Sequence, residues 1–418
     1  MKTKLFILLA AFCCSVTAMA QDDIDDERKS IYDDGFVEVD GIWYRHNMYD
    51  EDVDHYYASV IGPEEMDPDE YYDAFAATIY YEGDVVIPAS IRVNDVNIPV
   101  EGISYRAFCD RPGGSGGPAE MPLANGPRRM PAPGPAFPVT SVTLPNSLRW
   151  ISDMAFEGCS TLKSISFGNG LESIGWRAFF DCSGLTSISI PASVTEISSE
   201  AFFGCNGLTS ISVASGNTKY DSRNNCNAII EKSSKKLMTG CVNTVIPEDV
   251  VTINNGAFYD CDGLTSITIP NSVQSINNDA FRSCDGLISI IIPNSVKSIG
   301  NSAFAGCSQL VSVIIGSKVS SYGYYSPFDY CNKLREVTAL NPTPVAISSR
   351  VFPDRVKQTL YVAKGSKDAY KAADVWKEFK TIAEVGTSPE VVKGDMNGDG
   401  VLTIIDALII IEMILSNQ

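Results

Sequence analysis

The sequence predicts a β-rich solenoid in which short coils stack side by side, and an internal repeat is the main reason. A fixed period of this kind means that each repeat folds as one coil and buries its apolar edge against its neighbours. Alternating apolar and polar residues inside each repeat, and atypical segments at both ends, support the same fold class. The cysteines show the period, because they recur every 23 residues at Cys159, Cys182 and Cys205 and again at Cys261, Cys284 and Cys307.

Each repeat contains a short strand, a stop and an apolar plug. In residues 185–205 the motif L-x-x-I-x-I alternates like a half-buried strand, Pro191 ends it, and A-F-x-x-C closes the turn. The same frame recurs at residues 264–284 and 287–307. Stacking therefore places these strands in a parallel sheet with a spacing of about 4.8 Å.

The full pattern, L-x-x-I-x-I-P-x-x-V-x-x-I-x-x-x-A-F-x-x-C, resembles the BspA-type leucine-rich repeat of bacterial surface proteins over residues 83–340. The resemblance implies a right-handed solenoid of the horseshoe type, with short parallel strands joined by loops or 3-10 turns. It also implies contact with proteins or glycans, adhesion in some members, and no catalysis. Residues 214–246 break the period and resemble an irregular coil of that family, in which Ile229-Ile230 and Leu237-Met238 flank a turn at 232–236.

The segments around the repeats differ from them in composition. Residues 1–20 have the basic start, apolar run and small-residue end of an export signal; lipid attachment at Cys13 or Cys14 is the weaker alternative. Residues 21–82 form an acidic region and β cap with a hairpin at 36–44 around Asp40-Gly41. Residues 111–138 are rich in Pro and Gly and predict a loop extruded from the stack.

After the repeats, residues 341–383 predict a C-terminal cap. A closing strand is expected at 359–362, followed by a helix over 366–383, because Tyr370, Ala373, Trp376 and Phe379 have helical spacing. A linker, 384–393, precedes the last module, residues 394–418.

This last module carries the spacing of a calcium loop. Calcium takes six to eight hard oxygen ligands, and this spacing wraps them around one ion, with Gly400 at the sharp turn. Asp406 at position 12, followed at once by an apolar helix, resembles a dockerin repeat, which implies docking to a cohesin-like module, although family dockerins usually have two repeats and this chain shows one. The ligands at positions 1, 3, 5, 7, 9 and 12 are Asp395, Asn397, Asp399, the Val401 carbonyl, Thr403 and Asp406.

The tail also predicts a partner surface. In dockerins, loop positions 10 and 11 carry partner recognition; here they are Ile404 and Ile405. From Ile404 to Leu415 apolar residues cover every side of the helix, which therefore needs burial. Two alternatives follow: the helix folds against the end of the solenoid, or the tail is a separate module that meets another protein.

The composition argues against several classes of protein. The formal net charge is −19, which disfavours nucleic acid as a partner. Outside residues 1–20, no stretch of the sequence has the ~20 consecutive apolar residues that a transmembrane helix requires. Phosphate-loop and Cys-x-x-Cys motifs are absent from the sequence. His46 and His55 stand in the acidic region without metal-site spacing, so we expect exposed side chains there.

An exported protein with many cysteines normally forms disulfides, but the repeat favours a column of buried thiols. Cys226 and Cys241 leave that column, and their state is open. The outward strand positions are mostly Ser and Thr, so binding is expected at loops, at the N-terminal aromatics or at the patch Tyr322, Tyr324 and Tyr325. The sequence thus predicts a secreted or cell-surface, non-catalytic binding or adhesion protein with a Ca²⁺ site; the alternative is a non-catalytic component of a polysaccharide-degrading complex, recruited through the tail.

Overall fold

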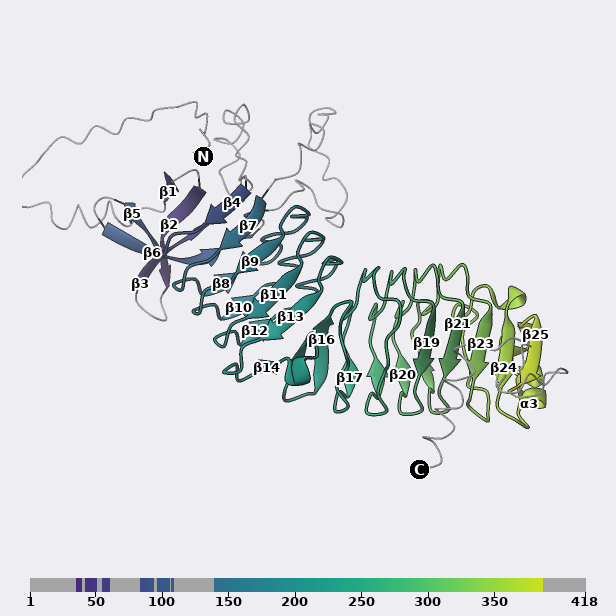
Figure 1. The fold of residues 1–418 in the computed structure, drawn as a ribbon. Helices are drawn as coiled ribbons and strands as arrows, with labels where there is room; N and C mark the ends of the chain where they lie inside the picture. The colour runs from purple at the N-terminus through teal and green to yellow at the C-terminus, as the bar shows by residue number, and fades with distance from the viewer. Residues whose placement is uncertain are drawn as a thin grey trace, which may run out of the picture.

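The computed structural model describes residues 35–39, 42–50, 55–60, 83–93, 96–105, 107–108 and 139–385. They form an elongated stack of coils, about 11 turns with parallel strands and little helix, as the sequence predicts (Figure 1). The export signal, the loop at 111–138 and the calcium-loop module at 394–418 lie outside these residues. Among the described residues no helix has the length and apolarity to cross a membrane.

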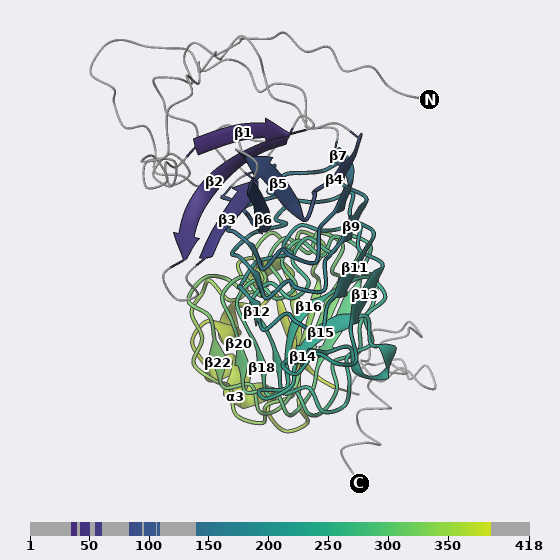
Figure 2. The same cartoon turned by 90° about the vertical axis from the view of Figure 1, so that its left-hand side faces the viewer.

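The N-terminal half of the stack has two sheets. One runs in the order β1-β2-β3-β6-β8-β10-β12, with β5 paired to β6 (Figure 1). The other runs in the order β13-β11-β9-β7-β4 (Figure 2). The strands are β1 Gly35–Val39, β2 Ile42–Asp50, β3 His55–Val60, β4 Gly83–Val86, β5 Ser90–Val93, β6 Val96–Ile103, β7 Val139–Thr143, β8 Trp150–Ile151, β9 Ser164–Ser166, β10 Ser173–Ile174, β11 Ser187–Ile190, β12 Glu196–Ile197 and β13 Ser210–Val213.

The C-terminal half also has two sheets, in the orders β14-β15-β16-β17-β18-β20-β22 and β19-β21-β23-β24-β25. The strands are β14 Tyr220–Asp221, β15 Ala228–Glu231, β16 Lys236–Gly240, β17 Thr252–Ile253, β18 Ser275–Ile276, β19 Ser289–Ile292, β20 Ser298–Ile299, β21 Ser312–Ile315, β22 Ser321–Tyr322, β23 Glu336–Ala339, β24 Thr359–Val362 and β25 Thr381–Glu384. Helical turns are η2 Arg223–Asn225, η3 Arg355–Lys357, α3 Lys367–Ala372 and η4 Trp376–Glu378.

The predicted hairpin is confirmed, since β1 pairs antiparallel with β2 across a two-residue connection. The strands of the repeats pair in parallel with the 23-residue offset, for example Ser187 with Ser210. Their burial alternates in β11, so Ile188 and Ile190 enter the core while Ser187 and Ser189 face solvent. The repeat therefore predicts both the pairing and the inward face correctly.

The predicted helix over 366–383 is wrong. Only α3 is α-helical; Ala373 is extended, Val375 has a φ of 67°, and residues 381–384 form strand β25. β25 pairs in parallel with β24, and Phe352 stacks on Phe328 at 5.2 Å. The stack thus continues past residue 340, and Trp376 and Phe379 cover its last plug ring because the exposed end of the core must be buried.

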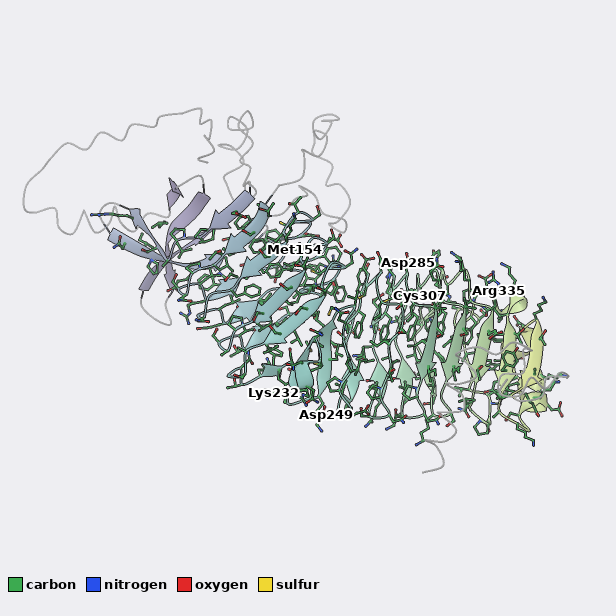
Figure 3. All side chains as sticks on the ribbon, viewed as in Figure 1. Met154, Lys232, Asp249, Asp285, Cys307 and Arg335 are labelled. Carbon is green, nitrogen blue, oxygen red and sulfur yellow. The ribbon has the colours of Figure 1, made fainter. Side chains whose placement is uncertain are left out.

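The A-F-x-x-C plugs make two continuous columns inside the stack. Neighbouring Phe rings lie parallel with centroids about 5 Å apart, such as Phe258, Phe281 and Phe304 at 4.9 and 5.1 Å. Six cysteines of the regular coils donate their thiols to the carbonyl oxygen of a plug Phe, as Cys307, labelled in Figure 3, does to Phe281 at 3.2 Å. The six are Cys159, Cys182, Cys205, Cys284, Cys307 and Cys331. The nine described cysteines are all free and buried, which confirms the expected buried thiols of the regular column. Cys226 and Cys241, which leave that column and whose state the sequence left open, are also free and buried.

The irregular coil separates the two Phe columns and bends the stack (Figure 1). β14, β15 and β16 form an antiparallel meander, whose last turn joins Glu231 to Lys236 as the sequence predicts. Gly240 takes the place of a plug Phe: its N–H donates to the Ala257 oxygen at 2.8 Å, as that of Phe258 does to Ala280. Across this break, Phe203 stacks on Tyr259 at 5.0 Å.

Candidate functional site: a tyrosine and arginine groove

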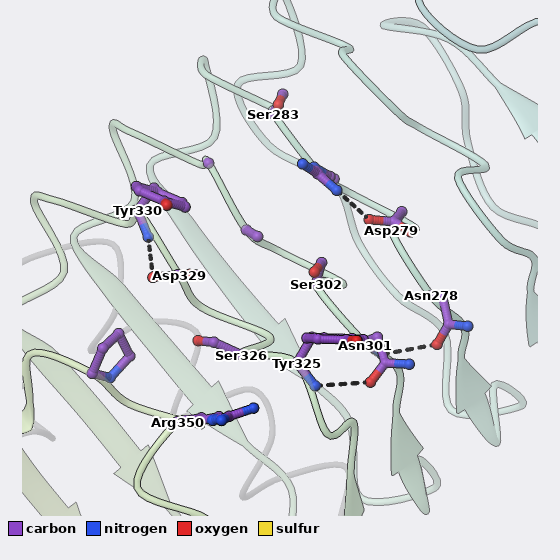
Figure 4. A pocket seen from close by; sticks show the side chains of 14 residues that line it. Asn278, Asp279, Ser283, Asn301, Ser302, Tyr325, Ser326, Asp329, Tyr330 and Arg350 are labelled. Atoms are coloured by element: carbon purple, nitrogen blue, oxygen red, sulfur yellow. Dashed lines mark hydrogen bonds and ion pairs between the residues drawn. The ribbon is translucent and has the colours of Figure 1, made fainter. Parts of the chain in front are cut away.

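An open groove of about 980 Å³ lies along the turns of the C-terminal half (Figure 4). The shape of the groove is set by the two residues that follow each plug Phe, because these residues line the groove and differ from coil to coil. In the middle coil they are Ala305 and Gly306, which form a low floor. In the coils on either side they are larger: Arg282 forms one wall and Tyr330 the other.

Tyr330 is held in an unusual backbone conformation. It has a φ of 56°, a left-handed region that bulky side chains rarely adopt. The equivalent position in other coils is occupied by Gly158, Gly204 and Gly306 or by small polar residues. A left-handed conformation costs an L-residue roughly 1–2 kcal/mol, so the backbone at Tyr330 is strained. The side chain at this strained position is 71% exposed to solvent.

An ion pair within one coil holds the Arg282 wall of the groove. The Arg282 guanidinium bonds to the Asp279 carboxylate at 3.1 Å. Burial lowers the pKa of Arg282, but the hydrogen bond to Asp279 and the negative charges of Tyr259, Asp279 and Tyr330 together outweigh it, so the pKa is raised. Burial also raises the pKa of Asp279, and Arg282 opposes that effect only in part. The pair therefore fixes both side chains at the groove edge.

An asparagine ladder fixes the backbone at the lower end of the groove. The Asn278 side-chain oxygen accepts the Asn301 N–H at 2.8 Å, and the Asn301 oxygen accepts the Tyr325 N–H at 3.0 Å (Figure 4). Beside it, the Ser326 hydroxyl is buried and has no hydrogen-bond partner within the part of the chain that the structure describes. A buried polar group without a partner is destabilising, so this hydroxyl favours a ligand that completes its hydrogen bonding.

Of the three tyrosines predicted as a patch, Tyr325 lines this groove and Tyr324 lies beside it, in contact with Tyr325 and Arg350. Tyr324 and Tyr325 are 67% and 61% exposed, and their rings meet edge to face at 5.3 Å. The Arg350 guanidinium lies over the Tyr324 ring at 4.7 Å, a cation–π contact that restricts both side chains. Tyr322 instead packs against the core, and burial of its hydroxyl raises its pKa, so the structure does not bring it to the patch.

The sequence prediction did not include Arg282, Tyr330 and Arg350. A signal for Tyr330 was available, because a tyrosine at a column of Gly, Asp and Ser is an exception within the repeat. Arg350 gave no such signal, since its segment departs from the repeat frame. The calcium ligands at 395–406, and Ile404 and Ile405 with them, lie outside the described residues; so do the side chains of His46 and His55. Among the described residues no group of three or more His, Cys, Asp or Glu side chains could hold a metal ion.

A stack of parallel-stranded coils with a lateral groove defines a leucine-rich-repeat solenoid. A family model of the BspA type leucine rich repeat region matches residues 136–236 and 228–357 in 6 copies, which is more than half of the chain. The chain therefore belongs to the BspA-type leucine-rich-repeat family.

The solved structures to which this chain is similar include leucine-rich-repeat proteins from three bacteria. That from Bacteroides ovatus is 22% identical, with 83% of this chain and 78% of that chain covered and a TM-score of 0.47. That from Eubacterium ventriosum is 18% identical, with 87% and 94% covered and a TM-score of 0.48. A leucine rich cell surface protein from Faecalibacterium prausnitzii is 18% identical, with 88% and 99% covered and a TM-score of 0.32. A comparison with curated proteins gives no match.

Proposed function

We propose that this chain is a non-catalytic binding protein of the cell exterior, and that the groove between Arg282 and Tyr330 binds a protein partner. The observation that carries the proposal is the strained, exposed Tyr330 beside Tyr325 and Arg350. Tyr and Arg dominate the energetics of protein interfaces because they combine apolar area with hydrogen bonding at a small entropic cost.

The groove is better suited to binding than to catalysis. Asp279 is engaged by Arg282, and the nine described thiols are buried away from it, with the pKa of Cys284 and Cys307 raised by burial. Export is supported by the signal-like composition of residues 1–20. Protein is favoured over glycan because the walls offer a cation–π pair and an ion pair, which match a charged and aromatic protein surface.

A second candidate rests on the tail. The calcium-loop spacing at 395–406 supports a Ca²⁺ site, and the dockerin resemblance supports a cohesin-like partner in a polysaccharide-degrading complex. Pull-downs with immobilised full chain against matrix proteins, glycans and cohesin modules, each with calcium and with a chelator, separate the two candidates. Binding through the groove does not need calcium, whereas docking through the tail does.

Substitution of Tyr330 gives a sharp test of the groove. Tyr330→Gly should leave the protein as stable as before or more stable by up to about 1 kcal/mol, because glycine tolerates the left-handed backbone. The same change should weaken partner binding by at least about tenfold, as expected for a tyrosine anchor. Thermal melting and surface plasmon resonance measure the two effects on the same sample.

Tyr105→Ala is the matched control, because Tyr105 is an exposed tyrosine in the N-terminal half, outside the groove. It should leave binding unchanged. Arg350→Ala should weaken binding as Tyr330→Gly does. A partner that binds both groove variants as tightly as the wild type uses another surface, and the proposal would then be wrong.

A further inference from the structure

The outer face of the last sheet differs from the rest of the solenoid. In the N-terminal half, the outward strand positions are hydroxyl residues such as Ser189 and Ser212, and they are paired across the sheet. In the C-terminal sheet the corresponding row contains apolar side chains and runs Ile291, Ile314, Thr338, Tyr361 and Ala383 across β19, β21, β23, β24 and β25. We call this row, with Ser312, the outer face.

Several residues of the outer face are buried although they point away from the core. Ile314 and Thr338 are each 4% exposed and Tyr361 is 8% exposed. Ile314 and Tyr361 nevertheless belong to neither hydrophobic core cluster, whereas their strand neighbours Val313 and Leu360 do. β21 is buried at all four positions, in contrast to the alternation in β11. A layer over the outer face is therefore required.

This layer is not another strand or helix of the described part of the chain. Within that part, the substantial contacts of β21, β23 and β24 are with strands of their own sheet. The apolar surface continues beside the row in Ile288 and Val311, which are 56% and 37% exposed. An apolar area of this kind on a sheet is a docking surface for an apolar element.

The geometry points to residues 404–415 of the same chain as that element: we propose that the apolar tail helix lies across the outer face. The described chain ends at Val385, directly after β25, which is an edge strand of this sheet. The chain from 386 to 403 spans at most about 60 Å, so the helix can reach every strand of the sheet.

The sizes of the two surfaces agree. A helix of 12 residues from Ile404 to Leu415 is about 18 Å long. The five strands from β25 to β19 span four intervals of about 4.8 Å, or about 19 Å. Because the helix is apolar on all sides, it requires burial, and the outer face provides an apolar surface of matching width at the point where the chain leaves the stack.

The test measures side-chain labelling by hydroxyl radicals in the full-length protein. Two tail variants are compared with the wild type: Leu408→Asp with Ile411→Asp, and Ile410→Asp with Ile414→Asp, which place charges on different sides of the helix. In at least one of them, labelling of Ile314 and Tyr361 should rise several-fold, while Tyr324 and Tyr325 stay as reactive as before. Unchanged labelling of Ile314 and Tyr361 in both variants overturns the proposal.

A reciprocal experiment checks the tail. Ile314→Asp should accelerate amide exchange in residues 404–415, and Ser189→Asp, at the same coil position in the N-terminal half, should not. An equal rate in the Ile314→Asp protein and the wild type overturns the proposal. Labelling is repeated after 100-fold dilution: unchanged protection supports docking within one chain, and protection that falls on dilution assigns the outer face to a second copy and overturns the proposal. The outcome is independent of the groove.

Discussion

At the scale of single residues, the plug phenylalanines carry much of the packing. The Phe281 ring is fully buried and stacked between Phe258 and Phe304, with centroids 4.9 and 5.1 Å away. Phe281→Ala removes both stacking contacts and leaves a cavity, so it should lower the free energy of unfolding by about 3–5 kcal/mol. Because each coil contacts only its neighbours, the loss should open the adjoining coils first.

Thermal melting and amide exchange of the Phe281→Ala protein measure these effects. Phe203→Ala is an informative comparison, since Phe203 is stacked only on Tyr259 across the break. It should be less destabilising than Phe281→Ala. A melting curve of Phe281→Ala equal to that of the wild type would show that the ring carries no core packing.

At the scale of elements, the irregular coil depends on one glycine. A Cβ built on Gly240 would lie 2.2 Å from the Phe258 ring, so this position has no room for a side chain. Gly240→Ala should therefore push Phe258 away and destabilise the C-terminal half by about 1–3 kcal/mol, the range for overpacking. Gly216→Ala is the matched control, because its Cβ would be 3.4 Å from the nearest atom.

Proteolysis and thermal melting compare the two glycine variants. Gly240→Ala should expose cleavage sites near residues 236–260 and lower the melting temperature, while Gly216→Ala should change little. Equal stability of the two variants would mean that the backbone at 240 moves freely, contrary to the close approach of the Phe258 ring.

The tail is the second element with its own prediction. At the proposed calcium site, Asp395, Asp399 and Asp406 would share one loop, and their repulsion would oppose its closure until Ca²⁺ binds. Amide exchange across 393–418 should slow when calcium is added, and residues 140–340 should not respond. The combined change Asp395→Ala and Asp399→Ala should abolish the effect; protection in the acidic residues 22–73 instead would assign the ion to the other end of the chain.

At the scale of the whole molecule, the chain has an excess of acidic residues, and several of its carboxyl groups are partly buried close to one another. Burial, followed by repulsion from Asp262, Asp181 and Asp285, raises the pKa of Asp260 above its usual 3.8. The folded state therefore binds protons more tightly there than the unfolded state does. This contribution to stability is present at low pH and is lost as pH rises through the raised pKa.

Asp260→Asn should consequently raise the melting temperature relative to the wild type at pH 7. The advantage should shrink as pH falls and disappear well below pH 3.8, where the carboxyl is protonated in both the folded and the unfolded wild type. Glu172→Gln is the control, because Glu172 is exposed and paired with Arg149. It should give no gain at pH 7. A stabilisation by Asp260→Asn that is the same at both pH values would exclude ionisation as its cause.

The sequence by itself determined the coil, its strands and its interior. A repeat brings position i against i+23, so Phe179, Phe202 and the regular cysteines meet their own equivalents whatever the rest of the chain does. It did not determine the groove, the bend or the last coil. Those depend on departures from the repeat: small Ala305 and Gly306 between larger neighbours, Gly240 in place of a ring, and a C-terminal segment whose helical spacing yields to pairing with β24. Only the tertiary structure decides them, because the size and backbone conformation of adjacent coils, and not the period, set the shape of the surface.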